Sequence, residues 1–274
     1  MRRYFFLLFI CSGLWTACDR TPLSFGVITD VHYSASRPEK GNRLYSLSKG
    51  KLQDAVSAFN VEDLSFVVSL GDLRDNVSEP FSDLAPVFEE LRFPVFFIPG
   101  NHDHDSDFRP YTKRLGRYRL IFLDSNAVAS YSTPGEDGEL EQYIERRGAD
   151  YKNWNGALGC RQREWLEKRL RISDLLGENV ICFSHMPVVP TDSMYSLLDA
   201  PEAEQILSRH KSVKAYICGH HHKGAFSSIG GRIPHLMLQG MIEGRENHFS
   251  IITVTDDEVS VKGFGAQTDY SASL

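Results

Sequence analysis

Short apolar runs recur along the chain, and polar residues follow most of them directly. Continuous apolar runs of this length are typical of strands that are buried on both faces of a parallel sheet. Segments with apolar residues at helical spacing lie between several of the runs, and this alternation predicts an α/β fold with parallel pairing. The predicted strands cover residues 25–29, 66–70, 95–98, 120–123, 180–183 and 213–218, and the predicted helices cover residues 44–59, 81–91 and 162–170.

The C-terminal part has a different character. Four further predicted strands, residues 226–229, 233–238, 249–255 and 259–264, follow one another without a helix between them. Asp256 and Asp257 fit a tight hairpin turn between the last two. We expect these strands to extend or face the first sheet, giving two packed sheets with helices outside. No internal repeat or low-complexity linker interrupts the chain, so we expect a single domain over residues 23–274.

Five of the predicted strands end in Asp, Asn or His side chains. In open α/β sheets, ligand sites gather at the carboxyl ends of the strands. Five strand ends that deliver such side chains therefore predict one shared cluster, and this mixture of oxygen and imidazole ligands predicts a metal site. The segments that follow the strands are Asp30-Val31-His32, Gly71-Asp72, Gly100-Asn101-His102-Asp103, Ser184-His185 and Gly219-His220-His221-His222.

The charge of such a cluster suits a phosphate substrate. Two aspartates with neutral His and Asn ligands would leave two divalent ions with about two uncompensated positive charges, enough to attract a phosphate. A cage made only of carboxylates would repel that substrate. Two ions about 3.5–4 Å apart can lower the pKa of a bridging water and hold the phosphoryl oxygens during in-line attack. The residue types therefore predict hydrolysis of a phosphate ester by a metal-bound hydroxide.

Taken in order, the five segments resemble the calcineurin-like metallophosphoesterases. The match spans residues 25–222, and family-like strands continue to about residue 264. A single Asp-x-His or Gly-Asp pair is common, but all five segments in order, each after a strand, are specific. The resemblance implies a four-layer αββα sandwich with two mixed β-sheets and a dinuclear metal site at the strand carboxyl ends, in agreement with the strand count.

The resemblance also implies a role for each side chain of the cluster. His102 would be the general acid or charge stabiliser at the leaving oxygen, and Asp75 would be its orienting partner. The remaining residues would be metal ligands: Asp30, His32 and His222 for the first ion, Asn101, His185 and His220 for the second, and Asp72 as the bridge between them.

A narrower resemblance concerns residues outside the ligand set. Residues 25–31, Asn155-Gly156 and residues 238–243 are similar to the manganese-dependent ADP-ribose/CDP-alcohol diphosphatase group. This similarity implies manganese, although Fe, Zn or Co also suits such ligands. It implies as substrate a diphosphate that links a nucleoside to a sugar or an alcohol. Asn76 replaces an Arg of the phosphoprotein phosphatases, which argues against that activity.

Other substrates and one other function stay open at this point. A small phosphodiester is a further candidate substrate. A broad phosphomonoesterase or nucleotidase is the alternative within the enzyme class, and a non-catalytic lipoprotein that binds metal and a phosphorylated ligand is the alternative outside it. Residues 125–160 form a long segment of weak periodicity, which either stacks on a substrate ring or is a surface insertion with one acidic helix. Its aromatic residues are Tyr131, Tyr143, Tyr151 and Trp154.

The N-terminal residues predict export. Arg2 and Arg3 precede an apolar run over residues 4–10, and small residues follow at Thr16 and Ala17, which describes a signal peptide over residues 1–17. Cys18 comes next, and the arrangement resembles a bacterial lipoprotein signal, with residues 18–22 as a tether. We expect an exported envelope protein, periplasmic or on the cell surface, with a lipid anchor on Cys18. Cleavage and release is the alternative.

Charge and cysteine content exclude two further classes. The formal net charge is -6 and no long Lys/Arg run is present, so we expect no nucleic-acid partner. Beyond the signal region, Cys160, Cys182 and Cys218 are an odd number without CxxC spacing, so no disulfide framework is expected.

Overall fold

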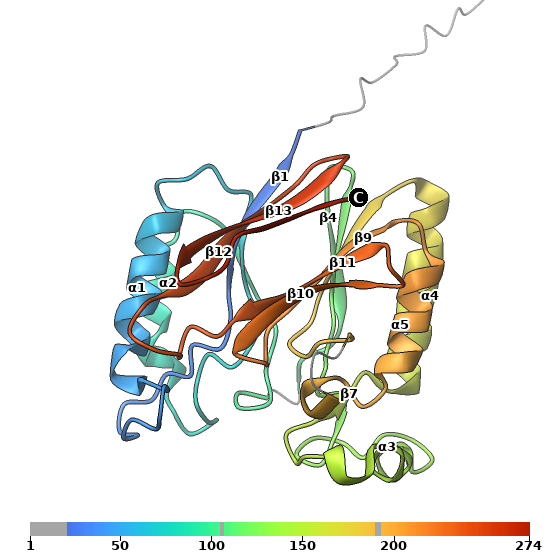
Figure 1. Ribbon diagram of the computed structural model, residues 1–274, viewed down its shortest axis with the longest axis horizontal. Helices are drawn as coiled ribbons and strands as arrows, with labels where there is room; N and C mark the ends of the chain where they lie inside the picture. Colours follow the sequence, from blue (N-terminus) through green and yellow to red (C-terminus); the bar gives the residue numbers. More distant parts are fainter. Residues whose placement is uncertain (1–20, 105–106, 190–192) are drawn as a thin grey trace, which may run out of the picture.

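The computed structural model of the protein describes residues 21–104, 107–189 and 193–274. Two six-stranded sheets pack face to face, and helices cover the outer face of each (Figure 1). This arrangement confirms the αββα sandwich that the sequence predicts. The signal peptide and Cys18 lie outside the described residues. Within the described part, none of the helices combines the length and apolar character needed to cross a bilayer.

The first sheet has the strand order β14-β13-β12-β1-β2-β3. Its strands β1, β2 and β3 are parallel, and the other three pairings are antiparallel. The hairpin between β12 and β13 turns at the predicted aspartate pair, because Val254 faces Val259 across it. The bounds are β1 (Leu23–Ile28), β2 (Val67–Ser69), β3 (Val95–Phe97), β12 (His248–Val254), β13 (Glu258–Gly265) and β14 (Tyr270–Ser273).

The second sheet has the strand order β10-β11-β9-β8-β5-β4. The pairs β5–β8, β8–β9 and β9–β11 are parallel, and the two edge strands pair antiparallel, so this sheet is also mixed. Its strands are β4 (Tyr111–Leu115), β5 (Tyr118–Phe122), β8 (Asn179–Phe183), β9 (Val213–Cys218), β10 (Lys223–Ile229) and β11 (Ile233–Gln239).

Aromatic side chains fill the interface between the two sheets. Phe25 of the first sheet stacks on Phe66 at a ring distance of 4.8 Å and meets Phe183 of the second sheet edge-on at 5.6 Å. All three are buried. A fully buried Phe contributes about 1.5–3 kcal/mol, so this cluster holds the two sheets in one relative position.

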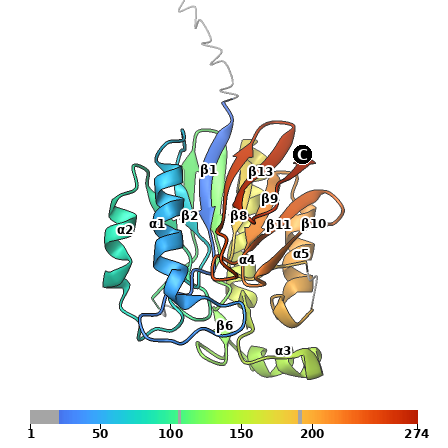
Figure 2. The ribbon, with the colours of Figure 1, turned by 60° about the vertical axis from the view of Figure 1, so that its left-hand side comes forward.

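Helices α1 and α2 cover the first sheet, and α4 and α5 cover the second, as Figures 1 and 2 show. Leu52, Val56 and Phe59 of α1 are buried against the first sheet at the spacing of one helix face. Leu166 and Leu170 of α4 pack on the second sheet in the same way. The bounds are α1 (Ser48–Phe59), α2 (Ala85–Glu89), α4 (Gly159–Leu176) and α5 (Ala200–Arg209).

A long excursion between β5 and α4 forms a small unit of its own at one end of the sandwich (Figure 1). It contains β6 (Val128–Ala129), α3 (Glu139–Arg147) and β7 (Gly156–Ala157), and β6 pairs with β7. Short 3-10 turns are η1 (Tyr45–Leu47), η2 (Phe81–Asp83), η3 (Gly148–Asp150) and η4 (Ser193–Tyr195).

Several elements differ from the sequence prediction. Residues 95–98 were expected to form a strand buried on both faces, but β3 is an edge strand and is partly exposed. The helix predicted over residues 44–59 starts as the 3-10 turn η1, and α5, β4 and β14 were not predicted. Cys160, Cys182 and Cys218 are free thiols.

Candidate metal centre

The loops after five strands meet at one end of the sandwich. Asp30 follows β1, Asp72 follows β2, Asn101 follows β3, His185 follows β8 and His220 follows β9. Strands of both sheets contribute, so the cluster lies where the two carboxyl edges converge. The predicted convergence of these side chains is therefore present in the folded chain.

The backbone at these positions is unusual. Asp30, His32, Asp72 and His220 have φ angles of 52°, 47°, 53° and 69°, and in the described residues Asp137 is the only other non-glycine with positive φ. Each such residue costs of order 1–3 kcal/mol and persists where surrounding contacts impose it. One such contact joins the His32 N–H to the Asp72 carbonyl oxygen at 2.8 Å.

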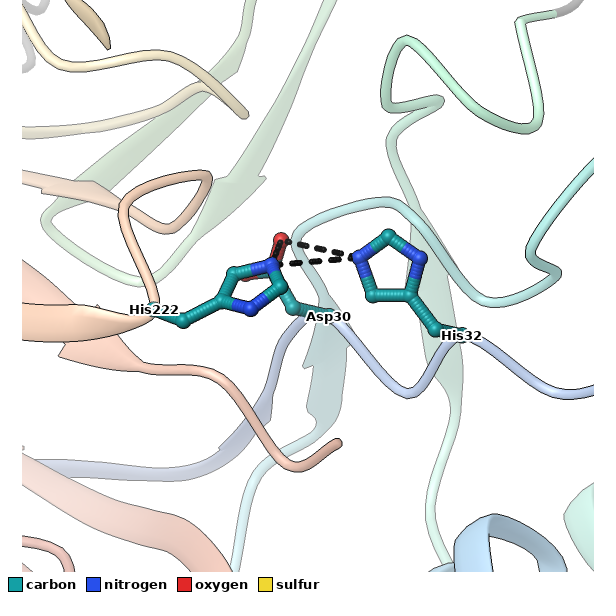
Figure 3. A group of neighbouring side chains, drawn as sticks. All are labelled: Asp30, His32 and His222. Carbon is teal, nitrogen blue, oxygen red and sulfur yellow. Dashed lines mark hydrogen bonds and ion pairs between the residues drawn. The ribbon is translucent and has the colours of Figure 1, made fainter. Parts of the chain in front are cut away.

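Asp30, His32 and His222 form one group of side chains, shown in Figure 3. His222 Nε2 lies 3.3 Å from Asp30 Oδ1 and 3.2 Å from His32 Nε2, and His32 Nε2 lies 3.8 Å from Asp30 Oδ1. With metal–ligand bonds of about 2.0–2.2 Å at angles of about 90–120°, neighbouring ligands of one ion stand about 2.8–3.8 Å apart. The three atoms are therefore spaced like ligands of a single ion.

The protonation of the two imidazoles supports this assignment. His32 Nδ1 faces Asp75 Oδ1 at 3.2 Å, and His222 Nδ1 faces Glu243 Oε1 at 2.8 Å. A carboxylate only accepts hydrogen bonds, so each Nδ1 carries a proton. In the neutral rings both Nε2 atoms then present lone pairs to one another, which is repulsive unless a cation lies between them.

A second group has the same properties. His185 Nε2 lies 3.1 Å from His220 Nδ1 and 3.2 Å from Asn101 Oδ1. His185 Nδ1 lies 2.8 Å from the Leu70 carbonyl oxygen, so it too must donate, and its Nε2 is bare in the neutral ring. This group fits a second cation.

Asp72 lies between the two groups. Its Oδ2 atom is 3.5 Å from His32 Nε2 and 3.4 Å from His185 Nε2. Its Oδ1 accepts the His102 N–H at 2.8 Å, which fixes the carboxylate. Gly100 allows this approach, because a Cβ there would overlap the Asp72 side chain. One carboxylate oxygen thus reaches both candidate positions.

A buried atom without a partner gives a further test of fit. Asp30 Oδ1 is buried and accepts no hydrogen bond from the described residues, and its nearest polar neighbour is the candidate ligand atom His222 Nε2 at 3.3 Å. The other oxygen of Asp30 accepts hydrogen bonds from Thr29 Oγ1 at 2.6 Å and from the His220 N–H at 3.0 Å. An unsatisfied buried carboxylate oxygen is costly, so the residues present fit a pair of divalent cations.

The electrostatics of the metal-free site lead to the same view. Burial lowers the pKa of His185, but the Asp72 carboxylate raises it, and the net pKa is about 9. Burial likewise lowers the pKa of His222 and the Asp30 carboxylate raises it, and the net pKa is also about 9. For Asp72, burial raises the pKa and His185 lowers it, and the net pKa is well below the usual range. Divalent cations bound at the centre would compete with protons for these imidazole nitrogens.

The two predicted catalytic residues are not paired as expected. His102 Nδ1 lies 2.6 Å from the backbone carbonyl oxygen of Asp75, whereas it is 3.8 Å from the Asp75 carboxylate. That carboxylate is closer to His32 Nδ1 and forms an ion pair with Arg37. Asp75 therefore orients His102 through its main chain, and its side chain serves His32.

A cavity of about 380 Å³ opens over the metal centre. Its lining includes His102 and five of the metal-ligand candidates: His32, Asp72, Asn101, His220 and His222. Lys40 and Arg43 line one part of its wall, and Trp154 and Tyr195 line another. Trp154 and Tyr195 stack with ring centroids 6.5 Å apart, and Tyr195 also stacks on His221 at 4.4 Å. Lys40, Arg43 and Tyr195 were not found by sequence reasoning, because they lie in loops without a motif.

The aromatic residues of the 125–160 segment divide between two locations. Trp154 lines the cavity over the metal centre, and Trp154 and Tyr131 line an adjoining cavity of about 530 Å³. Tyr143 and Tyr151 pack into a small core with Leu140 instead. One half of the segment thus lines cavities and the other half, with α3, packs as a structural insertion. Stacking on a substrate ring stays a prediction.

Residues 23–224 match the profile of the calcineurin-like phosphoesterase family. Over an alignment of 315 positions, gaps included, the chain is 27% identical to the manganese-dependent ADP-ribose/CDP-alcohol diphosphatase of Oryza sativa subsp. japonica, with coverage of 96% of this chain and 98% of that protein. The protein of the same name from Arabidopsis thaliana is 28% identical, with coverage of 89% and 95%.

The fold has a close counterpart among solved structures. A dimetal phosphatase from Danio rerio superposes with a TM-score of 0.81 at 22% identity, covering 92% of this chain and 98% of that one. The family match covers most of the chain and includes all seven metal-ligand candidates. The chain belongs to the calcineurin-like phosphoesterase family and is a metal-dependent hydrolase.

Proposed function

We propose that the chain hydrolyses the diphosphate linkage of a nucleotide-type substrate at a two-ion centre. Asp30, His32 and His222 would hold the first ion. The second ion would be held by Asn101, His185 and His220, and Asp72 would be shared. Bound there, two divalent ions lower the pKa of a water molecule and neutralise phosphoryl oxygens. Manganese is the proposed metal, on the strength of the relatives' names.

His102 would act at the leaving oxygen. Its Nδ1 proton is held by the Asp75 carbonyl oxygen, so Nε2 is the atom left to exchange a proton or stabilise charge. Burial lowers the pKa of His102, and its neighbour Arg43 contributes to that shift. Arg43 therefore lies near the side of the centre where the leaving group would depart.

The residues that line the cavity support a nucleotide-type diphosphate as the substrate. Lys40 and Arg43 line the cavity, and in the described part of the chain no carboxylate pairs directly with either, although the charge of Arg43 contributes to lowering the pKa of Glu243. Both cations can therefore contact a second phosphate. Trp154 and Tyr195 offer ring faces for a base, and stacking on an aromatic side chain is worth about 1–3 kcal/mol per base. A phosphomonoester without a base would use only the floor of the cavity.

A substrate panel tests this proposal. Purified protein with Mn²⁺ or Mg²⁺ would be assayed on ADP-ribose, a CDP-alcohol, nucleoside monophosphates and a bis-aryl phosphodiester. We expect the highest kcat/KM on one of the two diphosphates. Preference for the monophosphates would instead establish a phosphomonoesterase. Arg43→Gln should lower kcat/KM on the diphosphate by at least about tenfold, since a charged hydrogen bond is worth about 1.5–3 kcal/mol, and should lower kcat/KM on the aryl substrate by a smaller factor.

We also propose that the chain is exported and lipid-anchored through Cys18. The arginines, apolar run and small residues of positions 1–17 support a signal, and the cysteine follows it directly. Asp30 and His32 follow the carboxyl end of β1, whereas the first residue of the strand, Leu23, lies at its other end, seven residues before Asp30. At about 3.3 Å per residue, a tether at residues 18–22 would leave the cavity facing away from the membrane.

Detergent phase partition tests the anchor. Full-length protein expressed in a bacterium should enter the detergent phase of Triton X-114, and Cys18→Ser should move it to the aqueous phase. Wild-type protein that stays in the aqueous phase, with an unmodified Cys18 by mass spectrometry, would favour cleavage and release.

A further inference from the structure

Lys51 is a buried ammonium in the first turn of α1. The residue is only 5% exposed. Its Nζ donates to the carbonyl oxygens of Met241, Glu243 and Gly244, at 2.7, 3.0 and 2.8 Å. An ammonium has three N–H donors, so one turn of the chain uses all of them. Lysine is almost never buried without a compensating role, and here that role is to fix the turn formed by residues 240–244.

The 240–244 turn holds His222 on two sides. Glu243 Oε1 accepts the His222 Nδ1 proton at 2.8 Å, and the Gly240 N–H donates to the His222 carbonyl oxygen at 3.0 Å. A Cβ on Gly240 would lie 2.8 Å from Cγ of His222, so the ring rests directly on glycine backbone. The position of the turn therefore decides where His222 Nε2 points.

The same turn is bonded to the end of β1. The Met241 N–H donates to the Thr29 carbonyl oxygen at 3.0 Å, and the Ile242 N–H donates to the Asp30 carbonyl oxygen at 2.9 Å. Asp30 and His222 are far apart in the sequence, and the turn joins them. Both belong to the group of side chains assigned to the first ion.

We propose that Lys51 and Glu243 are positioning residues for the first metal ion. Glu243 orients the His222 ring and raises its basicity. Lys51 fixes the position of Glu243 by donating hydrogen bonds to the main-chain carbonyl oxygens of the turn. The inference rests on the metal roles proposed above. Loss of a carboxylate that supports a metal-binding histidine typically costs 10–100-fold in metal affinity, and neither residue contacts the second group of ligands within the described residues.

Metal titration of the metal-free protein tests this inference without substrate. Calorimetry with Mn²⁺ on the wild type should show two ions. Glu243→Gln, which removes the charge but keeps the shape, should weaken one ion by about 10–100-fold and leave the other within about twofold. Lys51→Met should weaken the same ion, and at limiting Mn²⁺ both variants should lose the electron paramagnetic resonance signal of a coupled ion pair. Lys49→Met, on the same helix but without a bond to the turn, is the matched control.

The double variant tests whether Lys51 acts through Glu243, and two negative outcomes of the titration distinguish failure of this inference from failure of the proposed function. Because Lys51 acts through Glu243, Lys51→Met/Glu243→Gln should bind the first ion about as weakly as the weaker single variant. Two ions of unchanged affinity in both single variants, with only a lower Tm in Lys51→Met, would overturn the inference alone. A wild type that binds fewer than two ions would overturn the proposed function and the inference with it.

Discussion

His102 Nδ1 lies 2.6 Å from the backbone carbonyl oxygen of Asp75. A carbonyl oxygen only accepts, so this contact selects the tautomer in which Nδ1 carries the proton. The Asp75 carboxylate is 3.2 Å from His32 Nδ1. One residue therefore supports two histidines, one by its main chain and the other by its side chain, and the two supports can be separated by mutation.

Replacement of His102 should remove catalysis and leave metal binding intact. His102→Gln is expected to lower kcat on a diphosphate by about 10²–10⁴, the usual contribution of a general acid. Calorimetry should still find two Mn²⁺ ions per chain. His102 lies close to His32 and Asp72, so loss of an ion in this variant would show that His102 is a metal ligand instead.

Replacement of the Asp75 side chain should act on the metal. Asp75→Asn keeps the main-chain carbonyl that holds His102, but it removes the charge that faces His32. We expect Mn²⁺ affinity at one position to fall by about 10–100-fold, and kcat at saturating Mn²⁺ to return to within a few-fold of the wild type. A loss of kcat that excess Mn²⁺ does not restore would indicate that the carboxylate acts on His102 after all.

The sequence predicts the centre better than its surroundings, for a physical reason. Buried strands that end in Asp, Asn or His are visible as motifs, since a core cannot hold these side chains unpaired. Arg43 and Tyr195 carry no such signal, because they reach the cavity through loops whose paths depend on tertiary contacts. Residues 238–243 were noticed as a pattern, but the bond from Glu243 to His222 could be seen only in the fold.

The edge strands of the two sheets are also poorly predicted by the sequence. A strand at an edge needs only one apolar face, so β4 and β14 lack the continuous apolar run that marks the central strands. β3 shows the converse error, since the apolar run Val95–Phe97 forms an edge strand that is partly exposed. Apolar content thus located the strands but did not determine their order in the sheets.

Asp72 should be the most sensitive ligand, because its Oδ2 atom reaches both groups. Asp72→Asn is expected to weaken both ions and to lower kcat/KM by more than about 10²-fold at any Mn²⁺ concentration. Asn101→Ala should affect one ion only. Titration of both variants with Mn²⁺ makes the comparison, and an equal effect on both ions in Asn101→Ala would contradict the division into two groups.

The aromatic wall should distinguish substrates by their base. Trp154→Ala is expected to raise KM for ADP-ribose or a CDP-alcohol by about 5–150-fold, given about 1–3 kcal/mol for stacking on one base. KM for a bis-aryl phosphodiester should change less, because that substrate has no nucleoside. Tyr151→Ala is the matched control, since Tyr151 comes from the same segment but packs against the small core. An equal change in KM in the two variants would show that Trp154 does not stack on the base.

Acid should destabilise the fold through His235, which lies outside the metal centre. This imidazole is 1% exposed, and its Nε2 accepts the Val188 N–H at 3.2 Å, so protonation would break a buried hydrogen bond. Burial lowers the pKa of His235 to about 3. Between its unfolded pKa of about 6.5 and that value, only the unfolded chain takes up the proton. The stabilisation is therefore complete above about pH 6.5 and is lost as the pH falls toward 3.

Urea unfolding of metal-free wild type and His235→Gln at pH 7 and pH 5 measures this contribution. His235→Gln should be less stable than the wild type at pH 7, because the glutamine side chain fits the buried site less well than the imidazole. At pH 5 the difference in unfolding free energy should shrink by about 2 kcal/mol, which is 1.4 kcal/mol per pH unit below about 6.5. Other titrating groups are common to both proteins and cancel. A difference that stays the same at both pH values would mean that His235 is protonated in the folded protein or accessible to solvent there.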